Sequence, residues 1–208
     1  KRAFNLSVLG KGQVGIVVVV YTKTGRAALK IRRVDADRKE MKHEAEMLAT
    51  ANRLGIGPHL LDKKEDFLLM ELVSGLLLPD WVKQVRGKGA RNRIRSVLRD
   101  ILEQCYVLDH AGLDHGELSH APKHIIIDAR HNSHIVDFET ASIARRTTNV
   151  TSICQYLFIS QLARTLEYRL GEIDDLRLVT VLRQYKHEPT RQNFDKIIRT
   201  CNLASSAQ

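Results

Sequence analysis

The sequence is poor in cysteine, in aromatic side chains and in long apolar runs. Its three cysteines lie far apart and form no CxxC pair, which argues against a disulfide framework and against a zinc cage. Aromatic residues make up only 5% of the chain, so the core must be built mainly from leucine, isoleucine and valine. The longest apolar run, residues 15–21, is far shorter than the ~20 residues of a membrane span, and no signal peptide is visible. We therefore expect a soluble, cytoplasmic protein that makes no membrane contact.

Acidic side chains are also scarce relative to basic ones. The chain has 33 lysines and arginines against 24 aspartates and glutamates, which gives a formal net charge of +9. The excess is concentrated in a basic segment without any acidic residue, Lys83 to Arg99, which contains Lys83, Arg86, Lys88, Arg91, Arg93, Arg95 and Arg99. Such an excess favours a polyanionic partner, here RNA or a ribonucleoprotein. A solvated helix face is the alternative interpretation of this segment.

The pattern of apolar residues predicts a strand-rich front and a helix-rich back. One helix is expected at 37–54, because Met41, Ala45 and Leu48 recur at helical spacing and glycines follow. The predicted strands around it are residues 4–9, 16–22, 27–32, 60–61 and 67–72. After Ser74-Gly75 the pattern predicts helices to about residue 203, with an amphipathic helix spanning 94–108 and two short strands at 125–127 and 134–136.

These elements predict an α+β chain of two lobes. The N-lobe, residues 1–73, would be a small antiparallel sheet with one helix. The C-lobe, residues 74–208, would be mainly helical, and the hinge would lie near 73–75. A chain of 208 residues has room for one large domain or two small lobes of this kind.

The first candidate site is a glycine-rich segment with the spacing GxGxxG, formed by Gly10, Gly12 and Gly15. A dinucleotide-binding fold would need a helix directly after the third glycine. The β-branched run at 16–20 favours a strand instead. A glycine-rich turn between two strands suits a flap whose backbone N–H groups lie over phosphates, and a plain hairpin turn is the alternative.

The second candidate is Lys30, in the segment Ala28-Leu29-Lys30-Ile31 of a predicted strand. An ammonium in this place, just after a glycine flap, can neutralise phosphate charge when an acid orients it. The following helix offers Glu44 and Glu46 for that task.

A polar loop and a strand end supply the remaining candidates. The loop follows the amphipathic helix and contains His115, Glu117 and His124, and polar loops between buried elements often carry catalytic groups. Its four histidines match no zinc-binding spacing. Asp137 follows the next strand, where its carboxylate could hold Mg²⁺.

Taken together and in this order, the candidates resemble the protein-kinase-like superfamily. Gly10, Gly12 and Gly15 match its glycine-rich loop, Lys30 its phosphate-anchoring lysine and Glu44 the helix partner of that lysine. Residues 69–73 resemble the hinge, with Met70 as gatekeeper and the backbones of Glu71 and Val73 facing an adenine edge. His115 to Ser119 resembles the catalytic loop, and Asp137-Phe138-Glu139 occupies the Asp-Phe-Gly position.

The resemblance implies ATP and Mg²⁺ as cofactors and a Ser/Thr protein as the phosphate acceptor. It implies Glu117, Lys30 and Asp137 as catalytic residues, and Asp137 and His124 as metal ligands. The implied nucleotide-binding residues are Gly10, Lys11, Gly12, Gln13, Gly15, Ala28, Lys30, Glu44, Met70, Glu71 and Val73. The reduced activation segment resembles RIO kinases, the small kinase of the KEOPS complex, and compact archaeal and bacterial predicted Ser/Thr kinases.

Two departures from the superfamily pattern keep other functions open. Glu117 stands where the family has aspartate, and Pro122 displaces the expected metal-binding asparagine, which leaves His124 just before the strand. Imidazole is a poorer ligand for Mg²⁺ than an amide oxygen is. A pseudokinase, or an ATPase switch that acts on a ribonucleoprotein through the basic segment, is therefore the alternative. A small-molecule kinase is a weaker one, because few residues remain to build an acceptor pocket.

Overall fold

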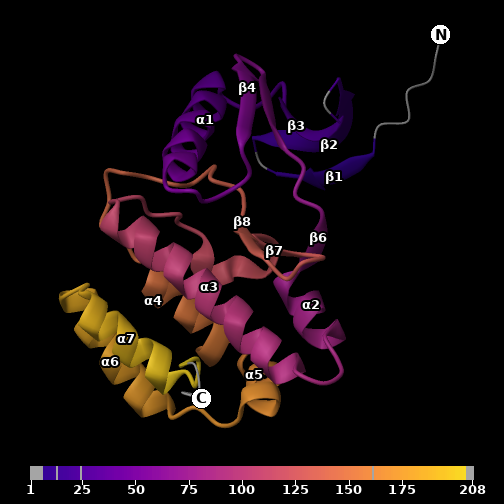
Figure 1. Cartoon of the computed structure of the whole chain (residues 1–208). Coiled ribbons are helices and arrows are strands. Elements are labelled where there is room, and N and C mark those ends of the chain that lie inside the picture. The colour runs from indigo at the N-terminus through magenta and orange to yellow at the C-terminus, as the bar shows by residue number, and fades with distance from the viewer. Residues whose placement is uncertain (1–6, 13, 24, 161, 205–208) are drawn as a thin grey trace.

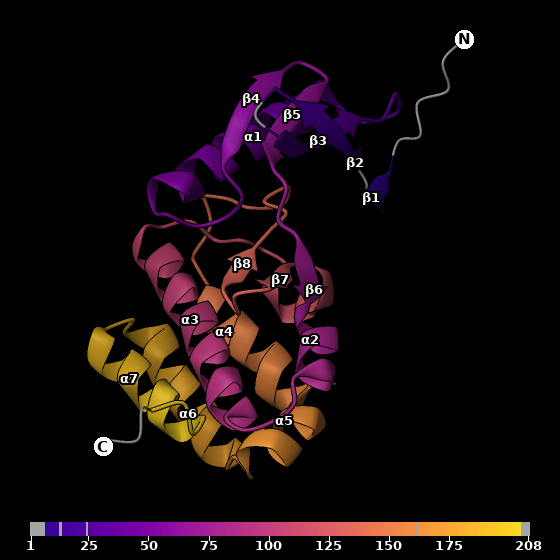
Figure 2. The ribbon, with the colours of Figure 1, turned by 45° about the vertical axis from the view of Figure 1, so that its right-hand side comes forward.

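The chain has an α+β fold, in which an antiparallel five-stranded sheet with a helix is followed by a mainly helical C-terminal region (Figures 1 and 2). The computed structural model describes residues 7–12, 14–23, 25–160 and 162–204. The α+β prediction is confirmed. The sheet lies at one end of the molecule, and the helices α2 to α7 fill the other end (Figure 1).

The sheet has the strand order β1-β2-β3-β5-β4, and all of its pairs are antiparallel. Its strands are β1 Val8–Lys11, β2 Gly15–Thr22, β3 Gly25–Arg32, β4 Leu60–Lys64 and β5 Phe67–Glu71. The strand predicted at 4–9 begins only at Val8 and runs on to Lys11, while residues 1–6 lie outside the described part. Lys30 lies on the central strand β3, opposite Val17 of β2 and Leu68 of β5.

Helix α1, Arg38–Arg53, confirms the helix predicted from the apolar spacing. Asp37 directly precedes α1 and caps it, because its side chain accepts a hydrogen bond from the backbone N–H of Lys39. The buried positions of α1 face the sheet and include Glu44, which lies between the apolar residues Met41, Ala45 and Leu48. The apolar stripe thus carries one carboxylate into the interior beside β3.

The C-terminal region is built on the long helix α3, Ala90–His110, whose apolar face is fully buried as the periodicity predicted. Around it lie α2 Leu78–Gln84, α4 Asn149–Cys154, α5 Ala163–Leu170, α6 Asp175–His187 and α7 Arg191–Thr200. A 3₁₀ segment, Leu118–Lys123, precedes strand β7, and a π-helical segment, Gln155–Ile159, follows α4. The cysteines at positions 105, 154 and 201 are buried and free.

A second, three-stranded sheet has the strand order β6-β7-β8. Its first strand, β6, follows β5 closely in the sequence. Its strands are β6 Gly75–Leu77, β7 Ile125–Asp128 and β8 Ser133–Ile135. Strand β6 was not predicted, because residues 75–77 were assigned to the helical region. Gly75 explains how it fits: a Cβ atom there would lie 2.2 Å from the carbonyl oxygen of Ile127, so the backbones approach too closely for any other residue.

Within the described ranges, no helix is both long enough and apolar enough to cross a membrane.

Candidate functional site

A cavity of about 470 Å³ lies between the large sheet, α1 and the segments that flank β7 and β8. This volume is in the range of small-molecule sites. The lining includes nearly every predicted nucleotide-binding residue, namely Gly10, Lys11, Gly12, Ala28, Lys30, Glu44, Met70, Glu71 and Val73. Asp137 also lines it. Gln13 lies outside the described residues, and Gly15 lies beside the cavity rather than in its lining.

Lys30 lines the cavity, and only 3% of its surface is exposed. Its Nζ lies 2.7 Å from Oε2 of Glu44 and 2.8 Å from Oε2 of Glu139, and it lies 3.5 Å from Oδ1 of Asp137. Burial by itself would lower the pKa of Lys30, but these carboxylates outweigh it and raise that pKa above the ordinary value. The lysine is therefore a fixed cation among three anions.

Glu44 is buried as deeply as its lysine partner. Burial raises the pKa of Glu44 above the ordinary value of a glutamate, and the charge of Lys30 opposes that rise. The structure brings Lys30 and Glu44 together as predicted, whereas Glu46 lies outside the cavity lining.

Glu139 is a site residue whose contact with Lys30 was not predicted. The sequence analysis placed it in an Asp-Phe-Glu triplet without giving it a partner. In the structure the carboxylate reaches from the segment after β8 to a lysine 109 positions earlier. The only sequence signal for this contact was that Glu139 stands where the Asp-Phe-Gly motif has glycine.

The glycine-rich turn covers the ion pair of Lys30 and Glu139. The N–H of Gly12 donates to the carbonyl of Gly15 at 2.8 Å, which closes a tight turn between β1 and β2. A Cβ atom at Gly15 would lie 2.9 Å from Cγ of Lys30, so the absence of a side chain lets the strand pass directly over the lysine. A Cβ atom at Gly12 would lie 3.5 Å from Oε2 of Glu139.

Asp137 is placed by a backbone turn two residues after β8. Its φ of 69° is left-handed, a conformation that non-glycine residues adopt at a cost and that is common at functional sites. The next residue, Phe138, is buried and anchors the turn in the core. A hydrogen-bond-length contact of 2.7 Å between Nε2 of His43 and the carbonyl of Ala141 ties this segment to α1.

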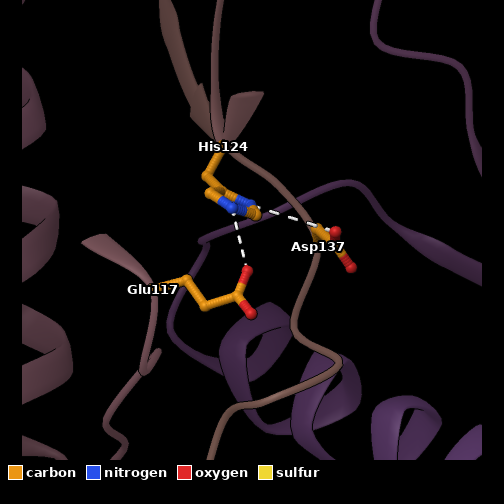
Figure 3. A group of neighbouring side chains, drawn as sticks. All are labelled: Glu117, His124 and Asp137. Atoms are coloured by element: carbon orange, nitrogen blue, oxygen red, sulfur yellow. Dashed lines mark ion pairs between the residues drawn. The ribbon is translucent and has the colours of Figure 1, made fainter. Parts of the chain in front are cut away.

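Glu117, His124 and Asp137 form a group whose possible ligand atoms all lie within 4.8 Å of one another (Figure 3). Nε2 of His124 lies 2.9 Å from Oε2 of Glu117, and its Nδ1 lies 3.9 Å from Oδ2 of Asp137. The ring of His115 packs edge-on against that of His124. Burial and the neighbouring His124 lower the pKa of His115 to about 4, so that this ring stays neutral and serves as a wall of the site.

Residues 69–73, which the resemblance assigns to a hinge, lie at the end of β5 and directly after it. Met70 pairs with Ala28 across the sheet, so that both lie on the same side of the cavity. The N–H of Glu71 donates to the carbonyl of His59 at 2.8 Å and is therefore already used. A ligand edge at this wall would meet the remaining polar groups of the segment from Glu71 to Val73.

The basic segment lies at the far end of the helical region from the large sheet (Figure 1). It spans the end of α2, the following loop and the start of α3. Arg91 and Arg93 donate to backbone carbonyls, and Lys83 lies 3.6 Å from Asp80. The structure does not bring this segment to the cavity, so any partner that it binds would contact a separate surface.

No known family model matches this sequence. The case for a function therefore depends on the geometry of the cavity. Lys30, two of the carboxylates around it and a glycine turn line the cavity from segments far apart in the sequence, beside an apolar wall. The predicted residues Glu117 and His124 lie outside this lining. This arrangement can hold a flat heterocycle, the phosphates attached to it and a divalent cation.

Proposed function

We propose that this protein is a compact, atypical kinase with a two-lobed protein-kinase-like fold. It would bind ATP with a divalent cation and transfer the γ-phosphoryl group to a hydroxyl of a protein acceptor. The observation that carries the proposal is the position of Lys30. Its ammonium lies within 3.5 Å of Glu44 from α1 and of Asp137 from the segment after β8, inside one cavity under a glycine turn.

The apolar part of the cavity suits an adenine ring. Val17 and Ala28 of the large sheet and Ile126 of β7 line the cavity from different elements, and Met70 adds a flexible side chain. Pockets of this kind bury most of a flat ligand and orient it through a few polar groups. The triphosphate would extend from the ring toward Lys30, under the N–H groups of the glycine turn.

Lys30 would then bind phosphate oxygens, and Glu44 would hold its ammonium in place. Phosphoryl transfer depends mainly on positioning and on neutralising charge, and a fixed buried ammonium supplies both. Glu139 occupies the side of Lys30 that faces the glycine turn. A nucleotide would have to displace its carboxylate in order to reach the lysine.

The residues present fit a divalent cation. Asp137 is 42% exposed on its side chain and offers carboxylate oxygens, which are the ligands that Mg²⁺ prefers. His124 adds a nitrogen where the family has an amide oxygen. A bound cation would neutralise phosphate charge. This neutralisation is needed because three carboxylates surround the buried ammonium of Lys30.

Glu117 would position the acceptor hydroxyl and accept its proton on the oxygen that does not contact His124. One of its oxygens lies 2.9 Å from Nε2 of His124, and the side chain is 41% exposed. This contact with His124 also favours a second candidate function. A glutamate engaged by a histidine is a poorer base, so a pseudokinase or an ATPase switch that binds an RNA-protein partner through the basic segment is the alternative.

The test compares nucleotide-induced thermal stabilisation with release or transfer of γ-phosphate from labelled ATP, using casein as the acceptor probe. A kinase gives both, and a pseudokinase gives stabilisation only. An ATPase gives phosphate release that RNA stimulates, through binding that weakens steeply with salt.

Lys30→Met and Asp137→Asn should abolish transfer, and Lys63→Met on exposed β4 is the matched control that should not change it. Lack of any nucleotide stabilisation in the wild-type chain would refute the proposal. Transfer that persisted in both cavity variants would refute the assignment of these two residues.

A further inference from the structure

The imidazole of His124 is buried between two carboxylates, and its two nitrogens lie at different distances from them. The residue is 8% exposed. Nε2 lies 2.9 Å from Oε2 of Glu117, whereas the buried Nδ1 has no hydrogen-bond partner within the part of the chain that the structure describes. Figure 3 shows the ring between the two acids, with Nδ1 on the side of Asp137.

The contact with Glu117 determines what the other nitrogen can do. An ionised carboxylate offers only lone pairs, so the 2.9 Å contact between its Oε2 and Nε2 of His124 favours the proton on Nε2. In the neutral ring Nδ1 then carries a lone pair. This lone pair and Oδ2 of Asp137 are two acceptors 3.9 Å apart, and neither can donate to the other. A buried acceptor without a partner costs about 1–3 kcal/mol, which a bound cation would offset.

A single metal ion can satisfy both atoms. Bonds from nitrogen and oxygen ligands to such ions are about 2.0–2.2 Å long, so two donors less than roughly 4.2 Å apart can reach one ion. The partly exposed carboxylate of Asp137 leaves a route from solvent. An imidazole that binds metal through one nitrogen and donates its other N–H to a carboxylate is a recurrent arrangement in metal sites.

The backbone holds the two ligand-bearing residues in a fixed relation. His124 directly precedes β7, and Asp137 follows β8 by two residues. These strands pair through Ile125 and Ile135, and the N–H of Val136 donates to the carbonyl of His124 at 2.9 Å. The pair is therefore set by a sheet and not by a free loop, as a preorganised site requires.

We propose that Nδ1 of His124 and the carboxylate of Asp137 bind a divalent transition-metal ion of the Mn²⁺ type in preference to Mg²⁺. Imidazole nitrogen favours first-row transition metals, whereas Mg²⁺ favours oxygen ligands alone. Glu117 acts as a positioning residue that fixes the tautomer and orientation of His124. The inference concerns the cation of the proposed kinase site, but the ion binds without nucleotide.

The experiment titrates Mn²⁺ alone into the full chain and follows the loss of the free-ion signal by electron paramagnetic resonance. Repeating the Mn²⁺ titration in the presence of Mg²⁺ gives the affinity of the chain for Mg²⁺ by competition. Wild type should bind Mn²⁺ at least tenfold more tightly than Mg²⁺. His124→Asn, which supplies an amide oxygen, should lower Mn²⁺ affinity about tenfold and bring the two affinities close together. His110→Asn on the surface of α3 is the matched control and should bind like wild type.

Glu117 has its own test within the same titration. Loss of a carboxylate that orients a metal-bound histidine typically lowers metal affinity by about 10–100-fold. Glu117→Ala should show such a loss, and Glu117→Gln should restore much of it, because a carbonyl oxygen still accepts from Nε2. Equal affinity of Glu117→Ala and wild type would refute the positioning role.

A wild-type measurement keeps the proposal testable even if a variant does not fold. Mn²⁺ should broaden the ring proton signals of His124 in a nuclear magnetic resonance spectrum at lower concentration than those of His110. Equal affinity for the two ions, or unchanged Mn²⁺ binding in folded His124→Asn, would overturn the inference. Metal binding without any nucleotide binding would refute only the proposed kinase function, so the two failures are distinguishable.

Discussion

Replacing Glu139 with glutamine should tighten the binding of metal-free ATP. The carboxylate of Glu139 lies 2.8 Å from Nζ of Lys30, under the glycine turn, where the proposed function places a phosphate. Glutamine keeps the size and shape of the side chain and removes its charge. A nucleotide would then compete with a neutral amide rather than with an anion.

The size of the effect follows from the ion pair that a phosphate must replace. A hydrogen bond to a charged partner contributes about 1.5–3 kcal/mol net, and Lys30 is nearly fully buried. Each 1.4 kcal/mol corresponds to a tenfold change in affinity. We therefore expect ATP to bind Glu139→Gln roughly 10- to 100-fold more tightly than wild type when a chelator removes divalent cations. The fold should tolerate the change, because Glu44 remains as a partner of the lysine.

The assay is isothermal titration of ATP into each variant in the presence of EDTA. Glu65→Gln, on the turn between β4 and β5, removes an exposed carboxylate from the same sheet and serves as the control with unchanged affinity. Affinity that stayed constant or fell in Glu139→Gln would show that its carboxylate does not occupy the phosphate position, and the arrangement proposed for the triphosphate would be wrong.

Two further predictions concern the fold around the site. Gly75→Ala should lower the free energy of unfolding, measured in urea, by about 2–3 kcal/mol, because the new Cβ would lie 2.2 Å from a backbone oxygen of Ile127. Gly10 has open space around it, so Gly10→Ala is the control and should change the free energy of unfolding little. In Asp128→Asn, the free energy of unfolding should fall less steeply as pH drops below 4. Burial raises the pKa of Asp128, but hydrogen bonds, chiefly those from Asn132, lower that pKa to about 2. A depressed pKa in the folded state stabilises above about pH 4, and this stabilisation, about 1 kcal/mol, is lost as pH falls through 2. An acid-unfolding curve with the wild-type slope in Asp128→Asn would contradict that assignment.

The sequence predicted the elements whose signal repeats along the chain. Helix α1 shows its apolar stripe at every turn, and the structure buries Glu44 on that stripe. The apolar spacing alone left Glu44 and Glu46 open, and only the resemblance selected Glu44. Helix α3 was predicted for the same reason. Strand β6 is three residues long with an exposed pattern, so it carries no periodicity, and only its pairing with β7 makes it a strand.

The site was predictable to the extent that motif order indicated a shared cavity. Lys30 and Glu44 were matched through the resemblance, and in the structure both lie on regular elements with buried faces. The contact of Glu139 with Lys30 and the orphaned nitrogen of His124 could not be foreseen, since they depend on turns outside helices and strands. Spacing along the chain does not determine how such turns direct a side chain.

The most direct test of the account is a crystal structure with Mn²⁺ and a non-hydrolysable ATP analogue. The account predicts that phosphate oxygens lie within hydrogen-bond distance of Nζ of Lys30, that Glu139 has left the lysine, and that the ion is bound by Asp137 and His124. A nucleotide bound on another surface, with the pair of Lys30 and Glu139 intact, would contradict it.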